Sequence, residues 1–263
     1  MLEVFLISLL AGAVGGLLAG LFGIGGGLVL VPILTFVFAA QQFPAELVMI
    51  MAVATSLATI VVTSVAAVNA HHRLGLVLWS KVLRLAPGIM LGAAIGAVIA
   101  DVISAVALRY VFIVFLLTIG VQMAWQIKPD TGALKQSLTL DFSLTTVIGI
   151  MSALLGIGGG TLTVPYLTAC QYPMRNAVAI SSACGLPIAI AGTMSYAVLG
   201  WHQSGLPEGS SGYIYLPAFA GIVLCSVLTA PIGARLAHSL PAQQLKRYFS
   251  VLIFILAAKL IWL

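Results

Sequence analysis

Two glycine-rich pentapeptides lie inside otherwise apolar sequence and could bind an anion through main-chain amides. The sequence Gly-Ile-Gly-Gly-Gly occupies residues 23–27 and recurs at residues 156–160. Glycine has no side chain and adopts left-handed dihedral angles, so such a stretch can interrupt a helix with a sharp turn. The N–H groups at the start of the next helix are unpaired and carry a partial positive charge. The pattern therefore predicts two helix starts able to bind a small anion.

Hydroxyl side chains near both glycine breaks could complete such a site. Hydroxyls donate hydrogen bonds to an oxyanion without adding a charge that would hold it permanently. The alternative is that Ser and Thr bond back to their own helices. The residues that we predict to bind substrate are Gly23, Gly25, Gly26, Gly27, Thr55, Ser56, Gly156, Gly158, Gly159, Gly160, Thr161, Ser181 and Ser182.

Three details refine this prediction. Thr55-Ser56 and Ser181-Ser182 are expected at matching places in the helix that follows each break, and Thr163 shares the first turn with Thr161. Pro32 and Pro165, at equivalent positions after the glycines, are expected to be structural helix breaks. No Lys-Ser/Thr pair follows either glycine run, so a nucleotide-binding P-loop is rejected.

The composition requires a membrane. Of 263 residues, 62% are hydrophobic and 6% are charged, whereas a soluble domain has about 25% charged residues. Apolar runs such as residues 47–68 reach the roughly 20 residues of a membrane-spanning helix. We therefore predict an all-α polytopic protein whose partner is the lipid bilayer. The net charge of +5 comes from Lys and Arg between apolar runs, where they fix orientation, so nucleic acid is not expected.

The apolar runs, and the residues that can begin or end a helix beside them, predict the helical segments. Pro44 and Pro173 stand where a helix can begin, and Asp141 is predicted to be an N-cap. Two runs of small residues, Gly12, Gly16, Gly20 and Gly88, Gly92, Gly96, predict close helix packing. The predicted helices are 2–22, 28–39, 45–68, 81–100, 105–126, 141–155, 162–169, 174–199, 213–237 and 243–262.

The chain is predicted to consist of two homologous halves, residues 1–127 and 141–263, joined by a linker at 128–140 in a single transmembrane domain. If each glycine break turns a helical hairpin back to its own side, nine Lys and Arg residues lie on one face and two on the other. If every segment spans, the split is six against five. Because Lys and Arg favour the cytoplasmic side, we favour inverted halves. Each half then has one hairpin and three transmembrane helices, or eight segments with each hairpin counted once. The segment 2–22 is long enough to cross completely, which leaves the other topology open.

Cysteine and histidine offer weaker chemistry. Cys170, Cys184 and Cys225 are too widely spaced for a metal site or a disulfide framework, so no metal and no cofactor is expected. Cys184 precedes Gly-Leu-Pro, which we expect to break a helix, and it would be the nucleophile of a membrane enzyme handling a sulfur species. The sequence lacks a base placed for that chemistry, so we predict no enzyme. The four histidines lie in or near loops and could couple a proton to transport.

The duplicated Gly-Ile-Gly-Gly-Gly-x-x-x-Val-Pro motif resembles that of the TauE/SafE sulfite-exporter family of bacterial membrane permeases. The resemblance covers essentially the whole chain. It implies transport of sulfur-containing anions such as sulfite, sulfoacetate and related organosulfonates. It also implies functional roles for the motif glycines, Pro32 and Pro165. Thr161 and Thr163 stand where the first copy has Leu28 and Leu30, so the two halves need not contribute equally.

The sequence thus predicts a secondary transporter that moves a small oxyanion, such as sulfite or an organosulfonate, across the bacterial inner (plasma) membrane. Transport would proceed by alternating access at a site near the midplane. No ATP-binding motif is present, so a gradient of protons or of the anion itself would supply the driving force. An anion channel built on the same site is the main alternative, and the membrane enzyme with Cys184 as nucleophile is the other.

Overall fold

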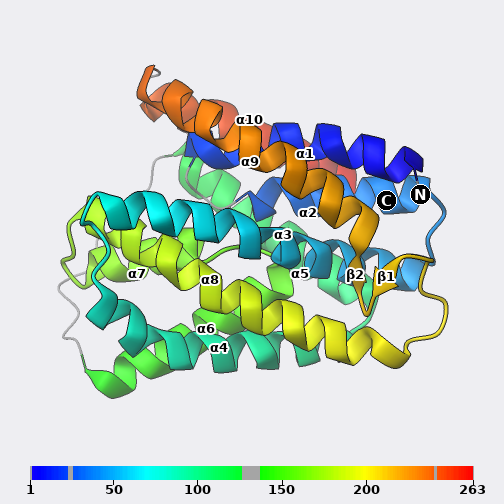
Figure 1. The fold of residues 1–263 in the computed structure, drawn as a ribbon, viewed down its shortest axis with the longest axis horizontal. Coiled ribbons are helices and arrows are strands. Elements are labelled where there is room, and N and C mark those ends of the chain that lie inside the picture. Colours follow the sequence, from blue (N-terminus) through cyan, green and yellow to red (C-terminus); the bar gives the residue numbers. More distant parts are fainter. Residues whose placement is uncertain (1, 23–25, 126–136, 240–241, 263) are drawn as a thin grey trace.

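The computed structural model describes residues 2–22, 26–125, 137–239 and 242–262, nearly all of them helical (Figure 1). Five of the described helices are long and apolar enough to cross a membrane, namely α3, α4, α5, α6 and α8. The protein is therefore a polytopic, all-helical membrane protein. The helices are α1 (Leu2–Phe22), α2 (Gly27–Ala40), α3 (Ala45–Arg73), α4 (Trp79–Val102), α5 (Ala105–Ala124), α6 (Leu138–Leu155), α7 (Gly160–Ala169), α8 (Met174–Leu199), α9 (Leu216–Ser239) and α10 (Ala242–Ile261).

Most helix starts follow the predicted punctuation, with one correction. Pro44 and Pro173 occupy the N-cap positions of α3 and α8, as predicted. The N-cap of α6 is Ser137, whose hydroxyl accepts a hydrogen bond from the Leu140 amide at 3.1 Å. Asp141 therefore lies inside the first turn of α6, where it is fully buried. A hydroxyl one turn earlier performs the capping, which leaves the carboxylate for another role.

The connection from α8 to α9 is more structured than predicted. It contains the 3-10 helix η1 (Gly200–His202) and two short antiparallel strands, β1 (Ser210–Ser211) and β2 (Ile214–Tyr215). The helix predicted from Tyr213 begins instead at Leu216. The reason is Gly212, whose φ of +57° turns the chain between the strands. A Cβ atom there would overlap the backbone of Ala197, so the turn lies directly on the end of α8.

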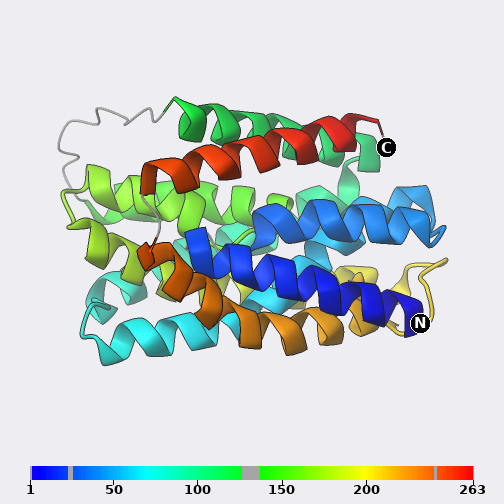
Figure 2. The ribbon, with the colours of Figure 1, turned by 90° about the horizontal axis from the view of Figure 1, so that it is seen from above.

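Two helical hairpins enter the bundle from opposite sides. The outer ends of α1 and α2 lie together on the right of Figure 1, and those of α6 and α7 lie together on the left. Helix α1 lies along α9, and α6 lies along α4. Between these pairs, α3 and α8 lie side by side and run in opposite directions (Figures 1 and 2). Each hairpin tip therefore points toward the middle of the bundle.

The small-residue runs bring these helices into close contact, as predicted. Cβ atoms added to Gly88, Gly92 or Gly96 on α4 would overlap α6. Cβ atoms on Gly12 or Gly16 would likewise overlap the α9 backbone near Ile222 and Ser226. Such backbone contact replaces the hydrophobic driving force that is missing between helices in lipid.

The prolines do not interrupt their helices. Pro32 lies inside α2 and Pro165 inside α7, so the predicted helix breaks at these residues are wrong. Helix α8 also continues through Pro187, which corrects the break expected after Cys184. Neighbouring helices can satisfy the backbone groups that a proline frees inside a membrane, which explains why the helices continue.

Candidate functional site

The two glycine motifs meet at the centre of the bundle. Gly156 ends α6 with a φ of +62°, and the buried residues 157–159 lead into α7. A Cβ atom on Gly27, the first residue of α2, would overlap the Gly156 carbonyl oxygen and lie 2.9 Å from Ile157 Cα. The start of α2 thus rests directly on the turn that ends α6. Gly23 and Gly25 lie outside the described residues.

The amides at both helix starts face these breaks. In α2 the first helical hydrogen bonds are donated by Val29 and Leu30 to the Gly26 carbonyl oxygen, both at 3.0 Å. In α7 Leu162 and Thr163 donate to the Gly159 oxygen, at 3.3 and 2.7 Å. N–H groups earlier in each first turn have no carbonyl partner within their own helix. They are the groups that a helix start offers to an anion.

Three hydroxyls beside the second break have no hydrogen-bond partner. They belong to Thr161 and Thr163 on α7 and to Ser181 on α8. A Cβ atom on Gly159 would lie 3.0 Å from Thr163 Oγ1 and 3.5 Å from the Ser181 carbonyl oxygen, so the Thr163 side chain and the Ser181 backbone adjoin the glycine turn. An unpaired buried hydroxyl costs about 1–3 kcal/mol. These hydroxyls are therefore open to a ligand that accepts hydrogen bonds, and Thr163 is the one that the contacts place beside the turn.

The remaining predicted hydroxyls already have partners. Ser56 donates to the Gly156 carbonyl oxygen at 2.8 Å, and Thr55 Oγ1 accepts from the Tyr215 amide at 3.1 Å. Ser182 bonds back to Val178 in its own helix at 2.9 Å. Thr55 is ten residues beyond the start of α3, whereas Ser181 is seven beyond the start of α8. The two hydroxyl pairs are thus offset by nearly one turn and are not at matching places.

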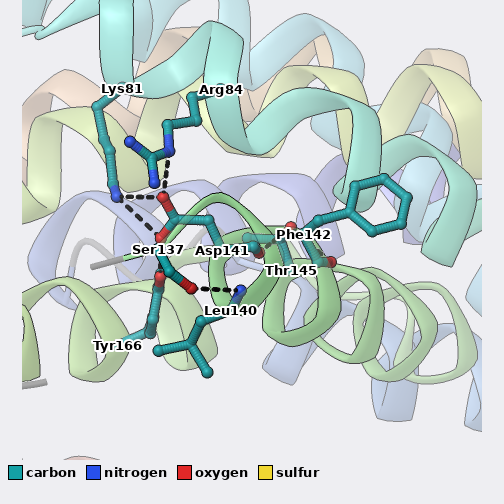
Figure 3. Close-up of polar contacts among 8 residues, drawn as sticks. All are labelled: Lys81, Arg84, Ser137, Leu140, Asp141, Phe142, Thr145 and Tyr166. Atoms are coloured by element: carbon teal, nitrogen blue, oxygen red, sulfur yellow. Dashed lines mark hydrogen bonds and ion pairs between the residues drawn. The ribbon is translucent and has the colours of Figure 1, made fainter. Parts of the chain in front are cut away.

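A buried ionic cluster, which the sequence analysis missed, lies at the outer end of the α6–α7 hairpin (Figure 3). Lys81 Nζ donates to both carboxylate oxygens of Asp141 at 3.0 Å. Tyr166 donates its hydroxyl hydrogen to Oδ1, and Arg84 Nε forms an ion pair with Oδ2. Lys81 and Asp141 are 5% and 0% exposed, whereas Arg84 is 35% exposed. We call these four residues the ionic cluster.

The sequence analysis had counted the basic residues only as signals of orientation and had given Lys81 and Arg84 no partner. Their spacing of three residues at the start of an apolar helix was the available signal, because it places both on one face. The ammonium group of Lys81 also lies 5.9 Å from the Tyr166 ring centre and 5.6 Å from that of Tyr172. Tyr166 follows Thr163 by three residues on α7, so one face of α7 connects the Thr163 hydroxyl with the ionic cluster.

The outer end of the α1–α2 hairpin is aromatic instead. Phe38 and Phe43 stack with ring centres 5.0 Å apart, and Tyr215 lies edge-on to both, at 5.6 and 5.2 Å. We call these three residues the aromatic cluster. Beside it, Tyr213 donates to Asp101 at 2.6 Å. Burial, and then the bond to Asp101, raise the pKa of Tyr213, so its hydroxyl stays a donor at neutral pH.

Comparisons with known proteins agree with this arrangement. The family model "Sulfite exporter TauE/SafE" matches residues 8–260. A probable membrane transporter protein of Haemophilus influenzae is 38% identical over 258 residues, which cover 98% of both chains. A probable membrane transporter protein of Methanocaldococcus jannaschii is 29% identical over 86% of this chain and 81% of its own. No solved structure matches the chain significantly. The chain is therefore a membrane transporter rather than an enzyme, and it belongs to the TauE/SafE sulfite exporter family.

Proposed function

We propose that the protein is a secondary transporter of a small sulfur-containing oxyanion across the bacterial inner membrane. The observation that carries this proposal is the central meeting of the two glycine breaks, where Gly27 contacts the Gly156 turn. Thr163 adjoins Gly159 at the second break, and the hydroxyls of Thr161, Thr163 and Ser181 have no hydrogen-bond partner. Helix-start amides and neutral hydroxyls suit an anion that must bind and then leave. The family description supports sulfite as the substrate.

The halves 1–127 and 141–263 are, in this proposal, inverted repeats. In support, α1 lies along α9 just as α6 lies along α4, and the two hairpins open toward opposite sides. Arg73, Lys81, Arg84 and Arg175 lie on the side where α6–α7 opens, which supports a cytoplasmic location for that side. Rocking of one half against the other would expose the central site alternately, as in other transporters with inverted repeats.

A flux assay in proteoliposomes tests the proposal. Sulfite, sulfate, thiosulfate and small sulfonates are presented in turn, with and without a pH gradient, which also tests proton coupling. We expect uptake of a sulfur oxyanion that saturates. We also expect counterflow exchange, because a site that faces the two sides in turn can carry a bound anion on its return. Flux that neither saturates nor exchanges would instead assign the site to a channel.

Variants at the two breaks test the site. Gly26 has a φ of +67°, which valine rarely adopts, and Gly159 adjoins the unpaired Thr163 hydroxyl. We expect Gly26→Val and Gly159→Val to abolish transport while the protein still inserts into the membrane. Wild-type flux in either properly inserted variant would remove the glycine motif from the mechanism.

A further inference from the structure

We propose that the anion of the central site binds in a space between Gly159, Ser64 on α3 and Gly185 on α8, and that Gly185 limits how large this anion can be. The inference rests on the proposed function and deepens it, because it names a contact from α3 and a size limit for the ligand. The ligand class is a small oxyanion. Neither Ser64 nor Gly185 belongs to the glycine motifs or to the hydroxyl pairs at Thr55-Ser56 and Ser181-Ser182.

An open space lies in front of Gly185, which is buried near the middle of α8. A Cβ atom added to Gly185 would lie 3.2 Å from Ser64 Oγ and 3.9 Å from the Gly159 backbone nitrogen. Apart from Gly185, its chain neighbours and the backbone of its own helix, these are the only described atoms within 4 Å of that position. Because glycine has no side chain, a ligand can approach the helix closely there. Both groups that border the space can donate hydrogen bonds.

The backbone amide of Gly159 is available to a ligand. Gly159 is buried and precedes the first residue of α7, so its N–H has no partner within that helix. No carbonyl oxygen of the described residues accepts a hydrogen bond from it, and buried amides without a partner are rare in proteins. The Thr163 hydroxyl points to a ligand independently. It is 0% exposed, has no partner and lies 3.0 Å from the position that a Cβ atom on Gly159 would occupy.

Ser64 brings a hydroxyl to the same space from α3, which packs against α8. Its exposed fraction is only 8%. The hydroxyls of Thr59 and Thr63 bond back to carbonyl oxygens of α3, whereas Ser64 makes no such bond within the described part of the chain. The Ser64 hydroxyl can therefore donate to a ligand. The first half of the chain thus contributes a contact to the anion.

These groups favour a small anion. The Gly159 N–H can only donate, and it lies at a helix start, where the partial positive charge attracts a negative ligand. The hydroxyls of Ser64 and Thr163 can donate to the same ligand without holding it by a full charge. A single methyl group on Gly185 would already lie 3.2 Å from Ser64 Oγ, so the space tolerates little additional bulk. An oxyanion of few atoms, such as sulfite, suits these limits.

Calorimetric titration tests the space without any need for transport. Sodium sulfite, and in a second series sodium sulfate, is titrated into purified full-length protein in an uncharged detergent. In Gly185→Ala the methyl group would displace the anion from its donors, so we expect the affinity to fall about tenfold or more. Ser64→Ala removes one donor and should weaken binding to a similar extent. Alanine is a better helix former than glycine, so Gly185→Ala should not lower the melting temperature.

Two neighbouring changes are matched controls. In Gly192→Ala, two turns further along α8, the new Cβ atom would meet the Leu57 side chain and Ala153 rather than a polar group. Thr63→Val removes a hydroxyl that bonds back to its own helix. Both control variants should bind the anion like the wild type, even if Gly192→Ala lowers the melting temperature. A merely structural role of Gly185 and Ser64 would instead make the affinity follow the melting temperature across all four variants.

The outcomes separate this inference from the proposed function. Wild-type affinity in both Gly185→Ala and Ser64→Ala overturns the inference, even if sulfite flux is normal. A wild-type protein that binds neither sulfite nor sulfate also overturns it, even if a larger sulfonate is transported. Binding that both variants weaken and both controls keep supports the inference, even if no sulfur anion is transported and the proposed function fails. Equal weakening in the controls would assign the effect to the packing of α3 against α8 and overturn the inference.

Discussion

The two helical hairpins carry the same glycine motif but differ at both ends. At its tip, the α1–α2 hairpin places Leu28 and Leu30, which are 1% and 4% exposed, in the core. The α6–α7 hairpin places Thr161 and Thr163 there with unpaired hydroxyls. At their outer ends, the first hairpin has the aromatic cluster and the second has the ionic cluster. At these two ends the first hairpin thus offers mainly apolar side chains, whereas the second offers polar ones.

This difference suggests a division of labour within a shared architecture. The α1–α2 hairpin supplies a helix start pressed against the Gly156 turn and, at its outer end, two stacked phenylalanine rings. The α6–α7 hairpin supplies unpaired hydroxyls on α7 and, at its outer end, the Asp141 carboxylate that pairs with Lys81 and Arg84. The polar contacts offered to an anion would therefore come mainly from the second hairpin. Matched substitutions in the two hairpins can test this contrast.

The largest effect is expected at the outer ends. Asp141→Ala leaves the buried Lys81 and the partly exposed Arg84 without their shared carboxylate, and breaking a buried pair such as Lys81–Asp141 costs about 3–5 kcal/mol. Ser8 is the matched position, 133 residues earlier, and its buried hydroxyl has no partner. We therefore expect Ser8→Ala to leave stability almost unchanged. Thermal unfolding of both variants in detergent measures the difference, and equal losses would show that the ionic cluster does not distinguish the hairpins.

The next effect concerns the tips. In Gly27→Ala the new Cβ atom would meet backbone atoms of Gly156 and Ile157, which cannot move aside, so we expect a loss of about 1–3 kcal/mol. In Gly159→Ala the new atom would meet Ile188 Cδ1 and Thr163 Oγ1 at 3.0 Å. These atoms end flexible side chains, so the loss should be smaller. If Gly159→Ala lowers the free energy of unfolding more than Gly27→Ala does, the tip of the α6–α7 hairpin is the more tightly packed of the two.

Much of the fold could be predicted from the sequence because membrane helices leave strong local signals. The lengths of the apolar runs predicted the membrane-spanning helices, and Pro44 and Pro173 marked two helix starts. The glycine breaks follow from the same local chemistry, since Gly156 adopts the left-handed conformation that ends α6. The strands at 210–215 were missed because each holds only two residues, too few for a period to emerge.

The candidate site was less predictable because partners depend on tertiary contacts. The sequence shows that Ser56 and Ser181 are hydroxyl residues, but only the packing shows that the first donates to Gly156 and the second has no partner. Asp141 was mistaken for a cap because an acid at a helix start usually is one. Its two cations come from α4, far away in the chain, and no local pattern could pair them.

A smaller effect is expected where one hairpin is bonded to α3. Ser56→Ala removes the 2.8 Å hydrogen bond to the Gly156 carbonyl oxygen, which should lower stability by about 1 kcal/mol. Ser182→Ala is the control on α8, because its hydroxyl bonds only within its own helix and should cost almost nothing. If both changes have the same effect on thermal unfolding, the Gly156 turn does not depend on α3.

The smallest stability effect, and the sharpest functional one, is expected at Thr163. Its hydroxyl is buried without a partner, so Thr163→Val should leave stability unchanged or raise it by up to about 1 kcal/mol. If the hydroxyl binds the anion, the same change should lower transport roughly tenfold or more, because a hydrogen bond to a charged ligand is lost. Thr163→Ser keeps the hydroxyl and should retain most of the flux. If the Thr163→Val protein is stable and has wild-type flux, the Thr163 hydroxyl does not bind the substrate.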